Sequence, residues 1–256
     1  MNVSAVLIVK NEAERLRGCL ESLCWASEII VLDSGSEDQT VAIAREYTDR
    51  VYVNTQWGGF GPQRQLAQTY ATSDWILAID ADEIVTDDLK QAIQLAVQGN
   101  DDAHVYAINR KNWAFGKFIH FSGWSPDWVV RLYPRAKTTY CDSLVHESVV
   151  LPSTMSMVHL PKKSRLLHYT YDDLYDYNRK VSGYLKSWAD QREGHNKSSV
   201  FKGVVHGVFA FLRMYILRLG FLDGRHGFVL AFLTGCTTSM KYFDLWLRKY
   251  EAESDD

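Results

Sequence analysis

Two carboxylates separated by a single residue, Asp80 and Asp82, are the first feature of this sequence that suggests chemistry. They follow the apolar run Trp75–Ile79 and precede a third acid, Glu83. In an extended segment, side chains two residues apart point to the same side. Such an oxygen-rich pair suits a hard divalent cation that keeps some water and binds a diphosphate. The spacing therefore favours a metal site, and the alternative is a polar loop of solvated acids.

A further acid, Asp33, comes directly after the apolar residues 28–32. A carboxylate at this point can accept hydrogen bonds from a base or a ribose, and Gly35 permits a tight turn. Ser36, with Gln39 three residues later, matches a capping box at a helix start. We favour a functional Asp33 beside a structural Ser36. The competing interpretation is an ordinary strand-to-helix turn.

These residues need an α/β framework to position them. Apolar runs predict strands at residues 4–9, 28–32, 50–54 and 75–79, and helical periodicity predicts helices at 12–23, 36–47, 63–71 and 87–97. This alternation is typical of a Rossmann-like, mostly parallel sheet with helices on both faces. Ligands of such sheets bind at the carboxyl ends of the strands. Asp33 and Asp80 should therefore lie on the same rim, and Thr86 should cap the last helix.

The pattern changes after residue 100. Strands are expected at 104–110, 129–133 and 144–150, and a helix at 172–191. The aromatic, Gly-containing connection 112–128 is long enough to be a functional loop. Polar residues near 194–199 then precede a basic, apolar tail. We therefore expect an α/β domain over residues 1–195 and an amphipathic helical, membrane-associated segment over 196–256.

Charge is unevenly distributed along the chain. Residues 1–100 carry 15 acidic and 7 basic side chains, whereas residues 197–250 carry 8 basic and 2 acidic ones. No uncharged apolar run approaches the ~20 residues of a spanning helix, so the chain is not expected to cross a membrane. Basic, apolar helices commonly lie in the membrane interface. We favour that place for the tail, and the alternatives are packing on the catalytic domain or a dimer interface.

The compartment is suggested by the four cysteines and by the first residues. The cysteines show no paired spacing, which favours a reduced, cytoplasmic protein. The apolar start is too short for a signal-peptide core and runs directly into charged residues. A cytoplasmic protein attached peripherally to the inner membrane is therefore expected, without a nucleic-acid partner.

Three motifs, in this order and spacing, resemble the family 2 glycosyltransferases with the GT-A fold. They are VKNE at 9–12, VLDSGSEDQT at 31–40 and WILAIDADE at 75–83. Two later motifs, WVVRLY at 128–133 and VHES at 145–148, are similar to those of the branch that contains the lipopolysaccharide core β-glucosyltransferases. The resemblance extends to about residue 150.

The resemblance implies an inverting transfer of a sugar, glucose in this branch, from a UDP-sugar to a lipopolysaccharide inner-core or other lipid-linked oligosaccharide acceptor. Mg²⁺ or Mn²⁺ is the implied cofactor. Asp33 is expected on the uridine, Asp80 near the ribose and donor, and Asp82 on the metal. Asn11 and Glu12 of the first motif are also expected to bind the nucleotide sugar.

Arg64 is expected at the pyrophosphate, although residues 63–65 (QRQ) depart from the family, which has an Asn after the basic residue. Arg131 is expected to bind an anionic group of donor or acceptor, with a structural salt bridge as an equal alternative.

Inversion needs a base that deprotonates the acceptor hydroxyl. Glu147 is the preferred base, because it matches the region where the family keeps this group. Asp127, within WSPDW at 124–128, is the second candidate. His146 is expected to ligate the metal or to orient the diphosphate. The competing interpretation of His146 and Glu147 is a surface strand with alternating polar residues.

Other functions fit the same motifs less well. A polyprenyl-phosphate glycosyltransferase is the runner-up, followed by a non-catalytic sugar-nucleotide-binding protein. A haloacid-dehalogenase-like phosphatase is disfavoured, because its acidic pair follows the first strand rather than the fourth. In addition, Ile84 stands where such phosphatases carry Thr or Val.

Overall fold

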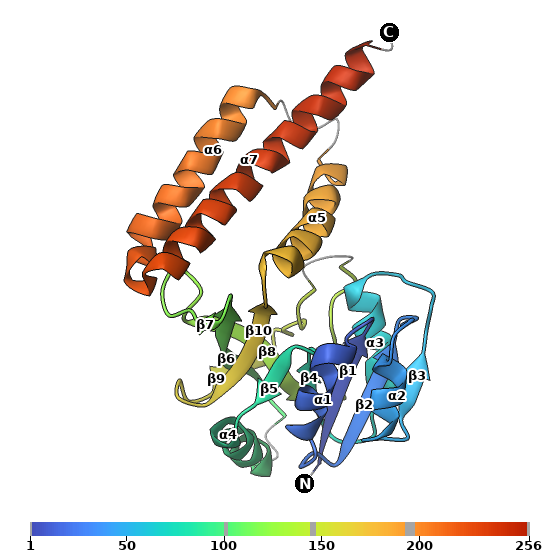
Figure 1. The fold of residues 1–256 in the computed structure, drawn as a ribbon. Coiled ribbons are helices and arrows are strands. Elements are labelled where there is room, and N and C mark those ends of the chain that lie inside the picture. The colour runs from blue at the N-terminus through green and yellow to red at the C-terminus, as the bar shows by residue number, and fades with distance from the viewer. Residues whose placement is uncertain (1, 100–101, 144–146, 193–197, 255–256) are drawn as a thin grey trace. The chain divides into compact units, whose positions relative to one another are not determined.

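The computed structural model describes residues 2–99, 102–143, 147–192 and 198–254 (Figure 1). The chain divides into two compact units. The first comprises Met1–Arg110 and Asp127–His168, and the second comprises Lys111–Pro126 and Tyr169–Asp256. The unit that contains the tail also includes residues 111–126 and the helix that precedes the tail. The expected division into functional domains at 195/196 stays a prediction.

The first unit is built on four parallel strands. These are β1 (Val3–Val9), β2 (Glu28–Asp33), β3 (Val51–Val53) and β4 (Trp75–Ile79), arranged in the order β3-β2-β1-β4. The connecting helices are α1 (Ala13–Glu21), α2 (Thr40–Arg45) and α3 (Phe60–Thr69), and α4 (Asp87–Gln98) follows β4. The predicted alternation is confirmed over this part of the chain.

The central strands β1, β2 and β4 are buried on both faces. Alternate β1 residues such as Leu7 pack with Leu16 of α1, Ala44 of α2 and the apolar side of α4, whereas Val6 packs with Ala67 of α3. Strands buried in this way lose the polar alternation of a half-exposed strand. Continuous apolar runs therefore marked these strands correctly.

The remaining strands make the sheet mixed. Its full order is β3-β2-β1-β4-β8-β6-β10-β5, with β7 and β9 paired to β6. The added strands are β5 (Glu83–Val85), β6 (His104–Ala114), β7 (Lys117–Phe118), β8 (Asp127–Pro134), β9 (Ser156–His159) and β10 (Arg165–Tyr171). Strand β8 runs antiparallel to both β4 and β6, and β10 runs antiparallel to β5. Strands β5, β7, β9 and β10 were not predicted.

Two local predictions are corrected. Helix α2 begins at Thr40 with Gln39 before it, so Ser36 is not its cap. The Ser36 hydroxyl is instead occupied by Asp33 and by the Asn11 backbone N–H. Of the strand expected at 144–150, residues 144–146 lie outside the described residues, and Val149 makes an isolated bridge. By contrast, Thr86 caps α4 as predicted, accepting a hydrogen bond from a backbone N–H at 3.3 Å.

The second unit is mainly helical. It contains α5 (Leu174–Asp190), α6 (Val200–Leu212), the π-helical turn η1 (Arg213–Leu217), the 3-10 turn η2 (Gly220–Asp223) and α7 (Arg225–Ser254). Helices α6 and α7 pack closely because their contact is lined by glycines. A Cβ on Gly207 would lie 2.7 Å from the Gly235 carbonyl oxygen, and one on Gly203 would lie 2.5 Å from the Phe243 ring.

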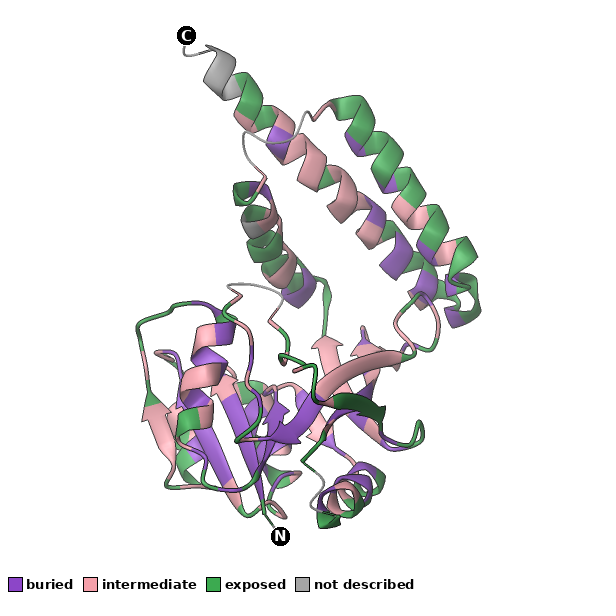
Figure 2. Ribbon diagram, turned by 180° about the vertical axis from the view of Figure 1, so that it is seen from behind, coloured by how far each residue is buried: buried purple, intermediate pink, exposed green. Residues whose placement is uncertain are grey.

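Much of the apolar surface of α6 is exposed, as Figure 2 shows. The segment Val200–Leu217 is long and apolar enough to span a membrane by length and composition, and only 17% of it is buried. It is the one such helix among the residues described. The sequence criterion of an uncharged run had passed over it because it contains Lys202 and Arg213. Length and composition alone do not distinguish spanning from lying in the interface.

Candidate active site

Asp80 lies just beyond β4 between two arginines. Its Oδ1 is paired with Arg64 of α3, and its Oδ2 is paired with Arg131 of β8. The other side of Arg64 pairs with Glu147, with 3.1 Å between Nε and Oε1. Four residues predicted on separate grounds therefore form one ion-paired group.

Glu83 extends this group toward the second candidate base. It is fully buried on β5, accepts the backbone N–H of Asp80 at 2.9 Å, and lies 2.8 Å from Arg131 Nη2. Arg110 Nη1 lies 3.6 Å from the same carboxylate, and its Nε pairs with Asp127 Oδ2 at 2.9 Å. Glu83 thus connects Asp127 to the Asp80 cluster, a role that the sequence did not reveal.

The two arginines keep Asp80 ionised. Burial alone would raise the pKa of Asp80, but Arg131 and Arg64 hold that pKa well below its usual range. Conversely, burial alone would lower the pKa of Arg131, but Asp80 and Glu83 raise it. Removing one partner of a buried pair leaves an uncompensated charge, which typically costs about 3–5 kcal/mol. Replacement of any one of these charged side chains is therefore expected to destabilise its ion-pair partners.

Arg131 shows the structural salt bridge that was one of its two expected roles. Its Nε is the one buried side-chain polar atom without a hydrogen-bond partner within the described ranges. Binding of an anionic substrate group by Arg131 stays a prediction.

Asp82 lies apart from this cluster, between Arg15 and His168. Its Oδ2 is 3.5 Å from Arg15 Nη1 and 3.7 Å from His168 Nε2. Burial, reinforced by Arg110, lowers the pKa of His168 to about 4, so its imidazole is neutral near pH 7. A neutral imidazole beside a carboxylate fits a divalent cation whose other positions are filled by water or diphosphate.

His168 was missed because β10, which positions it opposite Glu83, was not recognised from the sequence. His146, the histidine predicted as metal ligand, lies outside the described residues. In the part of the chain that is described, no three His, Cys, Asp or Glu side chains gather closely enough to hold a metal. Any cation here would depend on oxygen donors from solvent or substrate.

Asp33 is buried at the end of β2, and its carboxylate is engaged by its own turn. Its Oδ2 accepts the backbone N–H groups of Gly35 at 2.8 Å and Ser36 at 2.9 Å. These bonds fix the carboxylate at the rim where β1, β2 and β4 end. The structure thus shows the turn role of Asp33, and its contact with uridine stays a prediction.

Asn11 and Glu12 tie the ends of β1 and β2 together. The Asn11 backbone N–H donates to Ser36 Oγ at 2.8 Å, and its Oδ1 accepts the Glu37 N–H at 2.8 Å. The Glu12 N–H donates to Thr40 Oγ1 at 2.8 Å. Their expected role in binding the donor stays a prediction as well.

Comparisons with known proteins identify the family of the chain. Residues 4–191 match the model of "Glycosyl transferase family 2". The chain is 28% identical over 250 residues to the lipopolysaccharide core biosynthesis glycosyltransferase LpsC of Rhizobium meliloti, covering 91% of this chain and 90% of LpsC.

Two solved structures are similar in outline. One is S. aureus TarS 1–349 in complex with UDP, at a TM-score of 0.49 and 15% identity, covering 98% of this chain and 92% of that one. The other is glucosyl-3-phosphoglycerate synthase of Mycobacterium tuberculosis with Mn²⁺ and UDP-glucose, at a TM-score of 0.36 and 22% identity, covering 44% and 43%. With three quarters of its length inside the family model, and with a mixed sheet covered by helices on both faces, the chain belongs to glycosyl transferase family 2 and has the GT-A fold.

Proposed function

We propose that the protein is an inverting glycosyltransferase that moves a sugar from a UDP-sugar to a lipopolysaccharide inner-core acceptor. The observation that carries this proposal is the sharing of Arg64 between Asp80 and Glu147. This contact joins the expected donor-side acid to the expected base. The name of LpsC supports the acceptor class, and glucose is the sugar that the motif resemblance implies.

The charge of the site supports a cation-assisted donor. Five carboxylates pair with four arginines in and around the site, and His168 is neutral near pH 7. The carboxylates are Asp80, Asp82, Glu83, Asp127 and Glu147, and the arginines are Arg15, Arg64, Arg110 and Arg131. The net charge of the group is therefore −1 before a diphosphate enters. A site of this sign needs an added positive charge to favour a strongly anionic ligand.

Asp82 and His168 are the residues that would hold Mg²⁺ or Mn²⁺. Bound there, the cation would neutralise the charge that develops on the leaving diphosphate. Arg64 is positioned to exchange its carboxylate partners for a phosphate oxygen, because guanidinium groups bind both anions in the same forked manner.

Glu147 is the group that would accept the proton of the acceptor hydroxyl. Its Oε1 is held by the Nε of Arg64, which orients the carboxylate. A carboxylate is a competent base only when ionised and within hydrogen-bond reach of the hydroxyl. Asp127 is held by Arg110 in the same manner and remains the second candidate.

The test is a donor and acceptor screen with the full-length protein. Titration calorimetry with UDP is expected to show binding that strengthens when Mg²⁺ or Mn²⁺ is added. Absence of UDP binding with either cation would contradict the proposal. Incubation of UDP-sugars with truncated lipopolysaccharide core, followed by mass measurement, identifies the sugar. Transfer to polyprenyl phosphate instead would identify the runner-up function.

We further propose a cytoplasmic location with peripheral attachment to the inner membrane through the second unit. The exposed apolar side chains of α6 and the basic residues beside them support this attachment. Held in this way, the enzyme would meet an acceptor that is anchored in the inner leaflet.

A further inference from the structure

A second pocket of chemical interest lies entirely within the second unit. Its volume is about 490 Å³, which is within the range of small-molecule sites. Side chains of the loop 122–124, of α6 and η1, and of α7 line it. The polar part of the lining consists of Ser122, Trp124, His206, Arg213, Arg218, Thr234 and Thr238. No described acidic side chain contributes to it.

Its two arginines carry charge that the rest of the unit does not balance. Arg213 and Arg218 are exposed, and neither forms an ion pair with any described carboxylate. The guanidinium of Arg218 lies directly over Gly123, where an added Cβ would be 3.0 Å from Cζ. Gly123 has a φ of +77°, so its backbone and its missing side chain both make room for this arginine.

The one acid in this stretch of sequence is already used. Asp223 is the only Asp or Glu between residues 198 and 240, and it is buried. Its carboxylate accepts the backbone N–H groups of His120 at 3.0 Å and Phe121 at 2.9 Å. These bonds hold the loop that carries Ser122 and Trp124. The pocket is therefore a preformed cationic site with hydroxyls on its wall.

The exposed side chains of α6 near the pocket are mostly apolar. Val204, Val208, Phe209 and Leu212 of α6 are 42–57% exposed. A surface of this kind, with arginines beside it, matches the boundary between acyl chains and headgroups. Trp124 in the pocket wall is a residue type enriched at that depth.

We propose that this pocket binds the terminal phosphate of an anionic membrane lipid, with Arg213 and Arg218 as its charged ligands. Two guanidinium groups can contact a phosphate monoester through forked hydrogen bonds. The Ser122 hydroxyl already donates to Asp223 Oδ2 at 3.3 Å, and the Thr238 hydroxyl donates to the Thr234 carbonyl at 2.8 Å. The two arginines are therefore the main donors to the phosphate. The proposal rests on the membrane attachment proposed above, and it adds recognition of a specific headgroup chemistry to that attachment.

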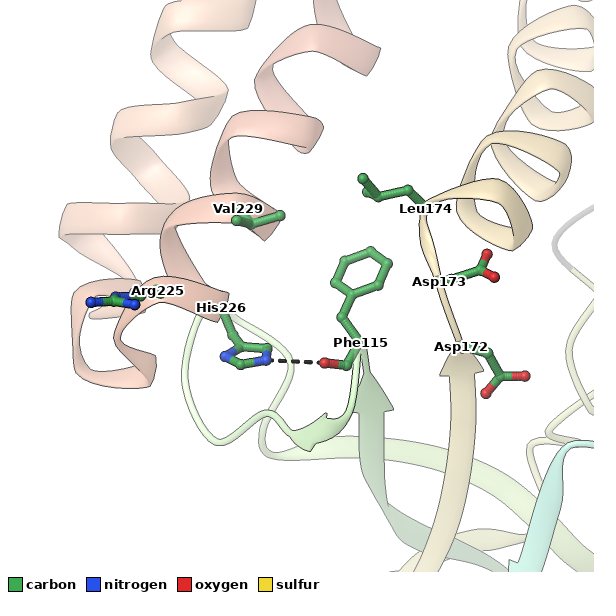
Figure 3. A pocket seen from close by; sticks show the side chains of 7 residues that line it. All are labelled: Phe115, Asp172, Asp173, Leu174, Arg225, His226 and Val229. Carbon is green, nitrogen blue, oxygen red and sulfur yellow. Dashed lines mark hydrogen bonds between the residues drawn. The ribbon is translucent and has the colours of Figure 1, made fainter.

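Arg225 provides a matched control within the same unit. It is exposed and basic, but it belongs to a different pocket, which Figure 3 shows bordered by Asp172 and Asp173. A phosphate is not expected among those carboxylates. Loss of any one basic residue near an anionic surface weakens attachment by about fivefold through charge alone. Arg225→Gln measures this general effect.

The experiment compares full-length protein on phosphatidylcholine vesicles that contain either phosphatidic acid or phosphatidylglycerol, adjusted to equal surface potential. The wild type is expected to bind phosphatidic acid vesicles at least tenfold more tightly. The double variant Arg213→Gln/Arg218→Gln should lose this preference. Arg225→Gln should weaken binding to both vesicles by about fivefold and keep the preference.

Either of two outcomes would overturn the proposal: the wild type binds both vesicles equally, or the double variant retains the preference. UDP calorimetry on the same variants separates this result from the proposed function, because Arg213 and Arg218 lie outside the unit that contains the candidate active site. Normal UDP binding with a lost lipid preference supports the pocket alone.

Discussion

Glu147 is held on Arg64 in a manner that a glutamine can imitate, since an amide oxygen also accepts the 3.1 Å hydrogen bond from Nε. We expect Glu147→Gln to bind UDP like the wild type but to slow transfer by about 10²–10⁴-fold, because the amide cannot accept a proton. Calorimetry measures the first quantity and single-turnover sugar transfer the second. Asp127→Asn is the matched control and should retain most activity. Rapid sugar transfer by Glu147→Gln together with slow transfer by Asp127→Asn would identify Asp127 as the base instead.

Asp82 and His168 are expected to act together on a cation. Replacing either by Ala should weaken Mn²⁺ binding by about tenfold or more, as loss of groups that hold or orient a metal commonly does. Electron paramagnetic resonance of free Mn²⁺ measures this directly, without reliance on turnover. Asp88→Ala, an exposed acid in the first turn of α4, is the control. Equal Mn²⁺ affinity in all three variants and the wild type would remove these two residues from the metal site.

The motifs of the sequence predicted several residues of the ion-paired cluster, but not the residues that the fold brings next to them. Arg64, Asp80 and Arg131 were predicted from motifs and are found in one group. Glu83 was expected in the site only as the last residue of the acidic motif, without a role of its own, and His168 was not predicted. Their importance comes from a pairing of distant segments, β5 with β10. Spacing along one strand shows which side chains share a face, but it does not show which strand lies next to it.

The start of β2 offers a test of stability at the scale of elements. Glu28 accepts the backbone N–H groups of Thr72 at 2.6 Å and Ser73 at 3.1 Å, and it pairs with Arg50. Burial opposes its charge, but hydrogen bonds from Ser4 and from the 72–73 segment lower its pKa to about 2. Its stabilising contribution is therefore complete above its ordinary pKa near 4.5 and is lost as the pH falls toward 2.

We expect Glu28→Gln to lower the free energy of unfolding near pH 7 by about 1–2 kcal/mol, after allowance for solvent screening. The same variant should differ little from the wild type near pH 2. Urea titrations at both pH values measure this difference. Glu46→Gln removes an exposed partner of Arg17 and should change neither curve measurably. A Glu28→Gln deficit that does not shrink on acidification would show that packing, rather than charge, is responsible.

The elements that the sequence predicted well share one property. Strands β1, β2 and β4 are buried on both faces, so they appear as uninterrupted apolar runs. Strand β9 is fully exposed and β10 mostly half-buried, and neither gives a clear apolar pattern. Helix α2 begins four residues after Ser36 because the Ser36 hydroxyl bonds Asp33 and Asn11 instead of a helix N-terminus. The preference of serine for helix N-termini does not show that other groups of the fold bind the same hydroxyl.

At the scale of the whole molecule, attachment to the membrane can be tested without shortening the chain. A deletion from residue 197 onward would remove Met214, Leu230 and Ala231 from the small core that they form with Ala114 and Ile119. Such a deletion would expose that core as well as remove the apolar surface. Point substitutions on exposed positions avoid this ambiguity.

We expect Phe201→Ser/Val208→Ser/Phe209→Ser to reduce vesicle binding by at least about 10²-fold, since each apolar side chain contributes roughly 1.5–3 kcal/mol when transferred from water. The three side chains are 54–77% exposed, so folding should be preserved, as circular dichroism can verify. Leu95→Ser, at an equally exposed position of α4, is the control and should bind normally. Unchanged vesicle binding of the triple variant would favour a packing or dimer role for this surface.

The expected boundary at 195/196 followed a change in composition along the chain. The compact units of the structure follow contacts instead, and loop 111–126 joins the later helices through Ile119 and Trp124. A contact between segments about a hundred residues apart leaves no local pattern in either of them. For that reason the division could not be obtained from the sequence.

The glycine-lined contact between α6 and α7 affects how stable this helix pair is in water and in lipid. Gly207 and Gly235 bring backbone against backbone, and Gly203 lies against the Phe243 ring, so dispersion forces and close polar contacts contribute to holding the helices together. Unlike an aliphatic core, such a contact does not rely on the exclusion of water. Under the proposed membrane attachment, the helix pair would therefore move between water and lipid without refolding. Such attachment would be reversible, and it would let one enzyme molecule serve many acceptors in turn.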